Sequence, residues 1–305
     1  MRYDDFRRKY DHLFTAVLNN VTINEIYERI LQSGLHYPIY DILFFDKQFK
    51  YEKDNPTDEM KTSTAFFQEH WDDVRECRKL LKDDLSRMVY GQAIRFRCTH
   101  DRKCFPPYSI NNQYFPHDII HLNTGEVFLD CGACKGDTFR RLQRESKNTF
   151  NKAVLFEVDN ENIHFIRKSI NDPRLLLVPK GVWSANTKVF FEDMGTDGSG
   201  RCVQNIDEIN GKTMNVEVCT IDSLDCCKDA TYIKMDIEGS EWEALHGAQE
   251  TIKRNYPKLA ICLYHNDEDY IRIISFVHEL NPNYNLYVRH HSTNTSETVL
   301  YAIND

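Results

Sequence analysis

Val127-Phe-Leu-Asp-Cys-Gly-Ala-Cys-Lys-Gly-Asp-Thr-Phe139 is the stretch that decides the fold. It begins as an apolar run, reaches Asp130, and continues through a loop bounded by Gly132 and Gly136. The aspartate and threonine that follow are residue types that begin helices. This order predicts a buried strand, a tight turn and a helix. Glycine suits such a turn because a ligand can approach the backbone closely where no β-carbon intervenes.

The spacing of this loop narrows the class of ligand. Its pattern is D-x-G-x-x-x-G, which differs from the G-x-G-x-x-G of dinucleotide enzymes and lacks the lysine and hydroxyl pair of a P-loop. An acidic residue at the strand end, Asp130, suits a ligand with positive charge better than a pyrophosphate. S-adenosylmethionine, which carries a sulfonium and an ammonium group, fits that description.

A second acidic residue supports a nucleoside site. The apolar run Ala153–Phe156 ends at Glu157, with Asp159 close behind. A carboxylate about 20 residues after the glycine loop is the expected partner of a ribose diol, because it accepts hydrogen bonds from both hydroxyls. A glycine loop alone would equally fit an ordinary surface turn. The two features together favour a nucleoside cofactor.

Composition excludes several classes of protein. The 305 residues include 38 Lys+Arg against 47 Asp+Glu, a formal net charge of −9, and no basic patch of the kind that binds nucleic acid. The charged start is unlike a signal peptide, and no apolar run approaches the roughly 18 residues of a membrane span. We therefore expect a cytoplasmic protein without stable membrane insertion.

Cysteine usage also indicates a cytoplasmic protein. Ten cysteines in an unexported chain of this size are expected to be reduced thiols. Cys131 and Cys134 form a C-x-x-C within the glycine loop, but no second pair has zinc-site spacing. We interpret them as small side chains in a crowded turn and predict no metal site.

Residues 1–118 are predicted to be a helical region that caps the substrate side of a second domain, residues 119–305. Two stripes at helical spacing support this prediction. The segment 105–116, with two prolines followed by a polar and aromatic run, is expected to be a connector. It would be either a plain linker or a cover for the cofactor pocket with Gln113 and Tyr114 as contacts. The stripes comprise Phe67, Trp71, Val74, Cys77 and Leu81, and then Leu85, Met88, Val89, Ala93 and Phe96.

From Glu126 onward strand and helix patterns alternate, which predicts an α/β fold with a parallel sheet and right-handed crossovers. The last two strands form a hairpin that would insert one antiparallel strand. This is the layout of a Rossmann-like class I methyltransferase sheet. The predicted strands are 127–130, 153–156, 175–178, 188–191, 216–220, 232–236, 259–264, 285–289 and 297–303.

Candidate catalytic residues follow two of these strands, where open α/β sheets bind ligands. Asp236 and Glu238 share an alternation and are expected to face one cleft, with Lys234 neutralising part of their charge. His265 ends the next strand and is our first candidate for general base, ahead of Glu238; Asp236 would hold the cofactor or orient the base.

Two further groups of charged residues have simpler explanations. Glu241 is expected only to complement a helix N-terminus. Arg289-His290-His291 would either contact a substrate or form a solvated hairpin, which is the simpler account.

From about Asn112 to Ile303 the chain resembles the FkbM family of S-adenosylmethionine-dependent methyltransferases. The matching pieces include VFLDCGACKGDTF, LFEVDNEN, PKGVWS, CTIDSLD and YIKMDIEGSEWEALHGA, of which the last is the most specific. The resemblance implies methyl transfer to oxygen, often on sugars or secondary metabolites. It also implies cofactor contacts at Asp130, Gly132, Gly136, Glu157 and Asp236, to which we add Tyr114, Ala133, Asp137, Thr138, Val158 and Val182.

Two other functions stay open at this stage. One is a nicotinamide-dependent sugar oxidoreductase, and the other is a non-catalytic module that binds a nucleoside cofactor. The sequence predicts a small-molecule or glycan acceptor but neither its identity nor the oligomeric state.

Overall fold

The structure is a computed structural model that describes residues 55–193, 200–203 and 212–304. All of these residues belong to one compact unit, Glu52–Asp305. The predicted helical region 1–118 is therefore described from residue 55 onward, and its earlier part lies outside the described residues.

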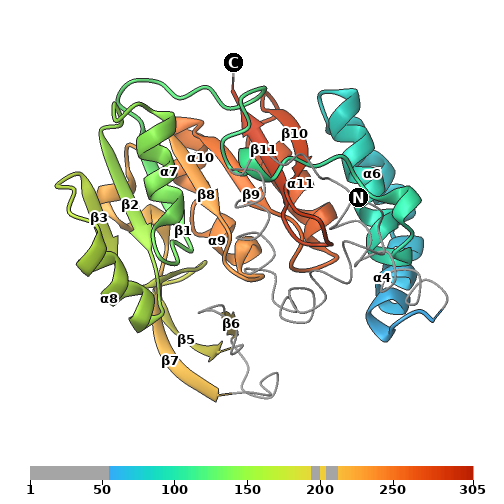
Figure 1. Cartoon of the computed structure of the whole chain (residues 1–305), viewed down its shortest axis with the longest axis horizontal. Coiled ribbons are helices and arrows are strands. Elements are labelled where there is room, and N and C mark those ends of the chain that lie inside the picture. Colours follow the sequence, from blue (N-terminus) through green and yellow to red (C-terminus); the bar gives the residue numbers. More distant parts are fainter. Residues whose placement is uncertain (1–54, 194–199, 204–211, 305) are drawn as a thin grey trace, which may run out of the picture. The chain divides into compact units, whose positions relative to one another are not determined.

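A seven-stranded sheet forms the centre of the unit (Figure 1). Its order is β10-β11-β9-β8-β1-β2-β3, in which every neighbouring pair from β9 to β3 is parallel. Strand β11 is antiparallel to both β9 and β10, which confirms the predicted inserted hairpin strand. The strands are β1 (Val127–Cys131), β2 (Lys152–Phe156), β3 (Leu175–Val178), β8 (Tyr232–Met235), β9 (Lys258–Cys262), β10 (Asn285–His290) and β11 (Thr298–Ile303).

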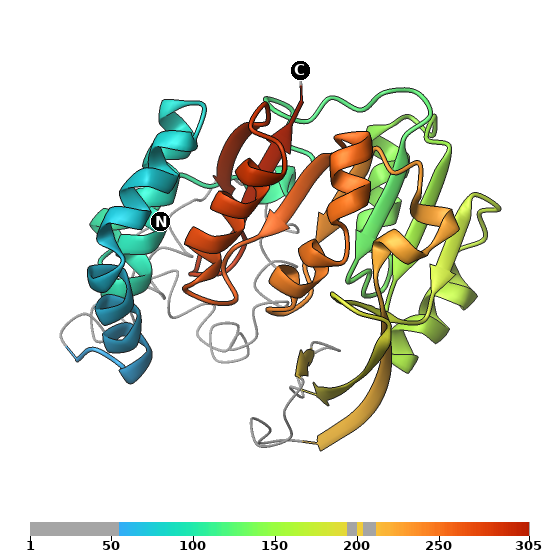
Figure 2. The same ribbon diagram turned by 180° about the vertical axis from the view of Figure 1, so that it is seen from behind.

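Helices cover both faces of this sheet (Figures 1 and 2). Side chains alternate between the faces: Phe128 and Leu155 pack with α7 and α8, whereas Leu129 and Val154 pack with α9, α10 and α11. Strands buried on both faces explain the near-continuous apolar runs in the sequence. The helices are α7 (Asp137–Glu145), α8 (Asn160–Ser169), α9 (Glu241–His246), α10 (Gln249–Asn255) and α11 (Asp269–Leu280).

A separate four-stranded sheet, in the order β4-β7-β5-β6, lies beyond β3 in the chain. It has its own small core around Trp183, Val189 and Val216. The strand patterns at 188–191 and 216–220 predicted two of its members but not their separation from the central sheet, because alternation does not specify a pairing partner. Its strands are β4 (Gly181–Val182), β5 (Thr187–Asp193), β6 (Gly200–Val203) and β7 (Lys212–Cys219).

Three helices before the connector pack on the β10 edge and on α11. Tyr90 donates a hydrogen bond to the Tyr270 carbonyl, 3.1 Å, and Lys82 N donates to Leu286 O, 2.8 Å. Phe67 and Val89 are buried as predicted. Trp71 and Met88 are 53% and 43% exposed, so the two predicted apolar stripes included residues that lie outside the packed faces of these helices. The helices are α4 (Asp58–Glu69), α5 (Trp71–Leu80) and α6 (Asp84–Thr99), and single 3-10 turns are η1 (Arg102–Cys104), η2 (Ile110–Asn112), η4 (Ile221–Ser223) and η5 (Asp225–Cys227).

Within the described part of the chain, no helix has the length and apolar character needed to cross a bilayer.

Candidate active site

The glycine loop joins β1 to α7 at the carboxyl edge of the central sheet. Gly132 has φ 83°, and a β-carbon there would overlap the carbonyl oxygen of Asp236. Gly136 has φ 76° and caps α7, where a β-carbon would lie 2.6 Å from Ile170 Cδ1. Both positions therefore require glycine, and the loop is pressed against the end of β8. The other predicted loop contacts follow the same turn: Ala133 and Thr138 are buried, and Asp137 is exposed.

Asp130, which ends the predicted first strand, is fully buried and lies 3.0 Å from Lys234 Nζ. Burial raises the pKa of Asp130 to about 6, and the nearby ammonium opposes that shift. Lys234 also donates to the Gly132 carbonyl at 2.8 Å. The pair thus links β1, β8 and the glycine loop, and Lys234 forms its ion pair with Asp130 and not with Glu238.

Glu157 follows β2, as predicted, and is 8% exposed. Its Oε2 accepts from Cys134 N at 2.7 Å, and its Oε1 accepts from Val158 N and Asp159 N at 2.8 Å. Burial raises the pKa of this carboxyl, and the three hydrogen bonds act in the opposite direction. Because a carboxylate accepts about four hydrogen bonds, Glu157 keeps capacity for one further donor.

Val158 and Val182, both predicted cofactor contacts, lie where the two sheets approach each other. The β-carbon position of Gly181 is 3.4 Å from Val158 Cγ1. Val182 itself is 3% exposed and belongs to the main core. Val158 is half-buried and so is the more accessible of the two.

Asp236 is the centre of a polar cluster at the ends of β8 and β9. Its Oδ2 accepts from the Tyr114 hydroxyl at 2.7 Å, and its Oδ1 accepts from the Tyr264 hydroxyl at 2.9 Å. Burial acts to raise the pKa of Asp236, but Lys234, His265 and these two hydroxyls lower it below its usual range. The connector therefore contacts this cluster through Tyr114 and is not a plain linker, while its position over a cofactor stays a prediction.

His265 lies among three carboxylates. Its Nδ1 is 3.0 Å from Glu241 Oε1, and its Nε2 is 3.3 Å from Glu238 Oε2 and 3.6 Å from Asp236 Oδ1. Burial acts to lower the pKa of His265, but Glu241, Glu238 and Asp236 raise it well above its usual value. The three carboxylates therefore favour the protonated form of the imidazole. The structure brings the three predicted catalytic residues together, as parallel strands ending at one edge require.

Two residues of this cluster have roles that the sequence did not predict. Glu241 is fully buried, accepts from Ile237 N at 2.8 Å and pairs with His265, so it does more than complement a helix N-terminus. Glu297 comes from the β10–β11 hairpin and accepts a hydrogen bond from Gln113. Glu241 stands in the motif YIKMDIEGSEWEALHGA, but its pairing with His265 was not predicted. Glu297 was predicted as the first residue of the strand 297–303 and instead lies in the turn before β11.

Two groups of side chains bring three atoms of metal-binding type within 4.8 Å of one another: Asp236 with Glu241 and His265, and Asp236 with Cys262 and Glu297. In the first group both nitrogens of His265 face carboxylates. In the second, Asp236 already accepts hydrogen bonds from Tyr114 and Tyr264. The absence of a metal site stays a prediction.

Arg289, His290 and His291 are buried, so the expectation of a solvated hairpin was wrong. Arg289 Nη2 pairs with Asp83 at 2.8 Å and with Asp118 at 2.7 Å. Burial lowers the pKa of His290 to about 3 and that of His291 to about 4. These residues tie helix α6 and the connector to β10, which a strand pattern does not reveal.

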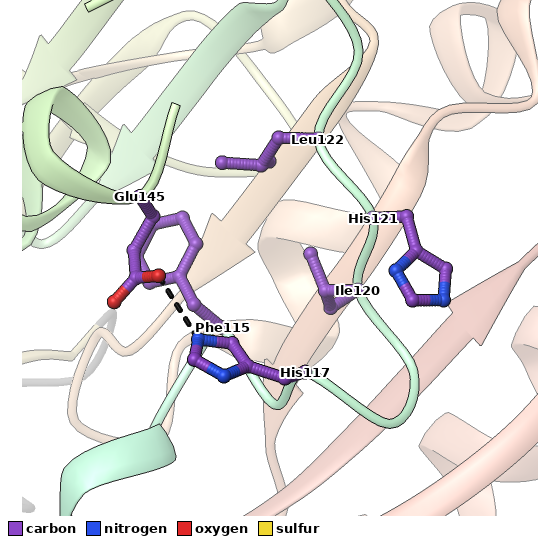
Figure 3. A pocket seen from close by; sticks show the side chains of 6 residues that line it. All are labelled: Phe115, His117, Ile120, His121, Leu122 and Glu145. Carbon is purple, nitrogen blue, oxygen red and sulfur yellow. Dashed lines mark hydrogen bonds and ion pairs between the residues drawn. The ribbon is translucent and has the colours of Figure 1, made fainter. Parts of the chain in front are cut away.

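A hollow of about 300 Å³ lies between the connector and the last turn of α7 (Figure 3). His117 Nε2 is 3.0 Å from Glu145 Oε2 across it. Because α7 starts at the glycine loop and Glu145 is its last residue, this hollow lies a whole helix away from the carboxyl edge. It is therefore distinct from the cluster around Asp236.

Comparison with known proteins identifies the class. The family model of the methyltransferase FkbM domain matches residues 130–285, and the chain belongs to this family. The methyltransferase FkbM from Methylobacillus flagellatus KT is similar in structure, with a TM-score of 0.63 and 24% identity over 78% of this chain and 60% of that one. The chain thus spans less than two thirds of that protein.

A weaker likeness is to the precorrin-6y C5,15-methyltransferase from Geobacter metallireducens GS-15, with a TM-score of 0.33 and 13% identity over 61% of this chain and 83% of that one. No curated protein matches the chain.

Proposed function

We propose that this chain binds S-adenosylmethionine at the carboxyl ends of β1, β2 and β8 and transfers its methyl group to a hydroxyl oxygen. One observation carries the proposal: the backbone of Gly132 lies against that of Asp236. A nucleoside held by the glycine loop would therefore be presented directly to the acidic cluster. Membership of a methyltransferase family agrees with a cofactor site at this edge of the sheet.

The residues present fit the cofactor. Glu157 has one acceptor position left for a ribose hydroxyl, and the glycines leave the loop backbone open. Asp236 and Glu238 supply negative charge near the loop, which complements a sulfonium. The remaining proposed contacts are Tyr114, Asp130, Ala133, Gly136, Asp137, Thr138, Val158 and Val182.

The bound cofactor would supply an activated methyl group, so the protein mainly has to align the acceptor oxygen with it. His265 was our first candidate for general base. A base needs a free nitrogen, and both nitrogens of His265 face carboxylates. We therefore propose His265 as a positioning residue that holds Asp236 and Glu238 in place.

The acceptor would approach from the side of Glu238, whose side chain is 44% exposed. We propose an acceptor hydroxyl on a sugar, a glycan or a secondary metabolite, and we propose that the reaction takes place in the cytoplasm.

Calorimetry and a transfer assay test this function. We expect S-adenosylmethionine and S-adenosylhomocysteine to bind the wild type, and a labelled methyl group to reach a member of a panel of hydroxyl acceptors. Glu157→Gln should weaken cofactor binding by roughly 10- to 150-fold, since losing one hydrogen bond with a carboxylate costs about 1.5–3 kcal/mol. Glu161→Gln, an exposed glutamate in α8, is the matched control. A wild type that binds neither compound would refute the proposal.

A further inference from the structure

Glu297 is held in an unusual position beside Asp236. Its backbone has φ 64°, a left-handed conformation that costs a residue with a β-carbon about 1 kcal/mol or more. His291 N donates to the Glu297 carbonyl at 2.9 Å, which fixes the turn of the β10–β11 hairpin. Strain of this kind is retained where the surrounding structure imposes it, commonly at functional sites.

The side chain of Glu297 forms a carboxyl pair with Asp236. Oxygen atoms of the two groups lie within 4.8 Å of each other, and both residues are half-buried. The Tyr264 hydroxyl oxygen lies 2.9 Å from Asp236 Oδ1 and 3.5 Å from Glu297 Oε1, and its single hydrogen serves only one of them at a time. Since Asp236 has the shorter contact and a second hydroxyl from Tyr114, Glu297 Oε1 is the less satisfied oxygen of the pair.

We propose that Glu297 is the catalytic residue that takes the proton from the acceptor hydroxyl. The negative charge of Asp236 lies beside Glu297 and stays in place during this transfer. This assignment rests on the proposed methyl transfer. It gives the proton a destination that His265 cannot provide.

The acceptor oxygen forms a bond to the methyl carbon as the carbon–sulfur bond breaks, and the electron pair of that bond goes to sulfur, which becomes a neutral thioether. The O–H bond of the acceptor breaks, and its proton moves to the Glu297 carboxylate. Glu297 then releases the proton to solvent before the next turnover.

The surroundings of Glu297 suit this role. Burial, and then the charge of Asp236, raise the pKa of Glu297 to about 8, with Glu238 acting in the same direction and His265 and Lys234 opposing it. A base is most effective when its pKa lies near the working pH. The titratable and charged groups that face Glu297 are Asp236, Glu238, His265, Lys234, Tyr114, Tyr264 and Cys262.

The pH dependence of turnover tests the assignment. In the wild type kcat should rise as Glu297 loses its proton and level off above about pH 8. Glu297→Gln should lower kcat by roughly 10²–10⁴-fold and abolish the rise, while the affinity for S-adenosylhomocysteine stays within about threefold. Glu297→Asp, which keeps a carboxyl, should recover part of the rate. Glu268→Gln, on the exposed residue before α11, is the matched control and should behave as the wild type.

Other results would overturn the proposal. If Glu238→Gln abolished the rise in kcat and Glu297→Gln preserved it, Glu238 would be the base. If a chelator stopped the wild type, Mg²⁺ or Mn²⁺ restored it, and Glu297→Gln weakened metal binding, the carboxyl pair would be a metal site.

The failure of the proposed function itself would look different, because the wild type would then transfer no methyl group. In that case infrared titration of the protonated carboxyl band, compared between wild type and Glu297→Gln, still decides whether Glu297 ionises near pH 8.

Discussion

Replacing Gly132 by alanine should destabilise the protein more than its conformation alone explains. Gly132 and Gly125 have nearly the same left-handed φ, 83° and 85°. A β-carbon at Gly125 meets nothing within 4 Å, whereas at Gly132 it overlaps the Asp236 carbonyl oxygen and lies 3.0 Å from the Asp236 carbonyl carbon. Both substitutions therefore carry the cost of the left-handed conformation, and only Gly132→Ala adds a steric overlap.

The magnitudes follow from these two costs. The left-handed conformation costs alanine about 1–2 kcal/mol at either site. Overpacking against backbone adds about 1–3 kcal/mol at Gly132 alone. We expect the free energy of unfolding to fall by about 2–5 kcal/mol in Gly132→Ala and by about 1–2 kcal/mol in Gly125→Ala. The difference corresponds to roughly 2–12 °C in Tm for a unit of this size.

Urea unfolding of both variants and the wild type measures the two costs. Gly247→Ala supplies a third comparison, because a β-carbon there overlaps the Trp183 carbonyl oxygen without a positive φ. Gly132→Ala should also weaken S-adenosylhomocysteine binding, since the loop must move away from Asp236. Equal stabilities of the Gly125 and Gly132 variants, within about 0.5 kcal/mol, would refute the close approach of the loop to β8.

Two further predictions concern buried charges. Lys234→Met leaves Asp130 buried without its counter-charge and should cost about 3–5 kcal/mol in urea unfolding, of which the double variant with Asp130→Asn should recover a large part; no recovery would show that the pair does not interact. The raised pKa of His265 means that its stabilising contribution is complete below about pH 6.5 and is lost as pH rises through the folded-state pKa. The Tm advantage of the wild type over His265→Gln should therefore shrink on the alkaline side, and an advantage that stayed constant with pH would contradict the imidazolium.

The central sheet could be predicted because its strands are short apolar runs that end in polar residues. The first strand was predicted as 127–130 and is Val127–Cys131, and the final hairpin was placed correctly. The separate sheet was missed because an alternating pattern shows which face of a strand is buried but not which strand it pairs with. Trp71 was assigned to the core because helical spacing does not distinguish the middle of an apolar face from its margin.

The site was predictable where it depends on topology. Asp236 and His265 follow adjacent parallel strands, so the fold alone brings them together. Glu297 reaches the same place through a hairpin that turns back from β10 to β11. Its position depends on the register of an antiparallel pair and on a left-handed turn residue, neither of which leaves a pattern in the sequence around it.

The acidic end of β1 illustrates how a correct motif can be explained by the wrong physical cause. Asp130 was expected to provide charge for a cationic ligand, but its carboxylate is fully buried and faces Lys234 at 3.0 Å. That same lysine donates to the Gly132 carbonyl, so the ion pair sets the position of the glycine loop. We propose that the charge offered to a cationic ligand comes instead from Asp236 and Glu238, which are partly exposed. One buried pair shapes the loop, and in this proposal a second set of acids, held by His265, attracts the sulfonium.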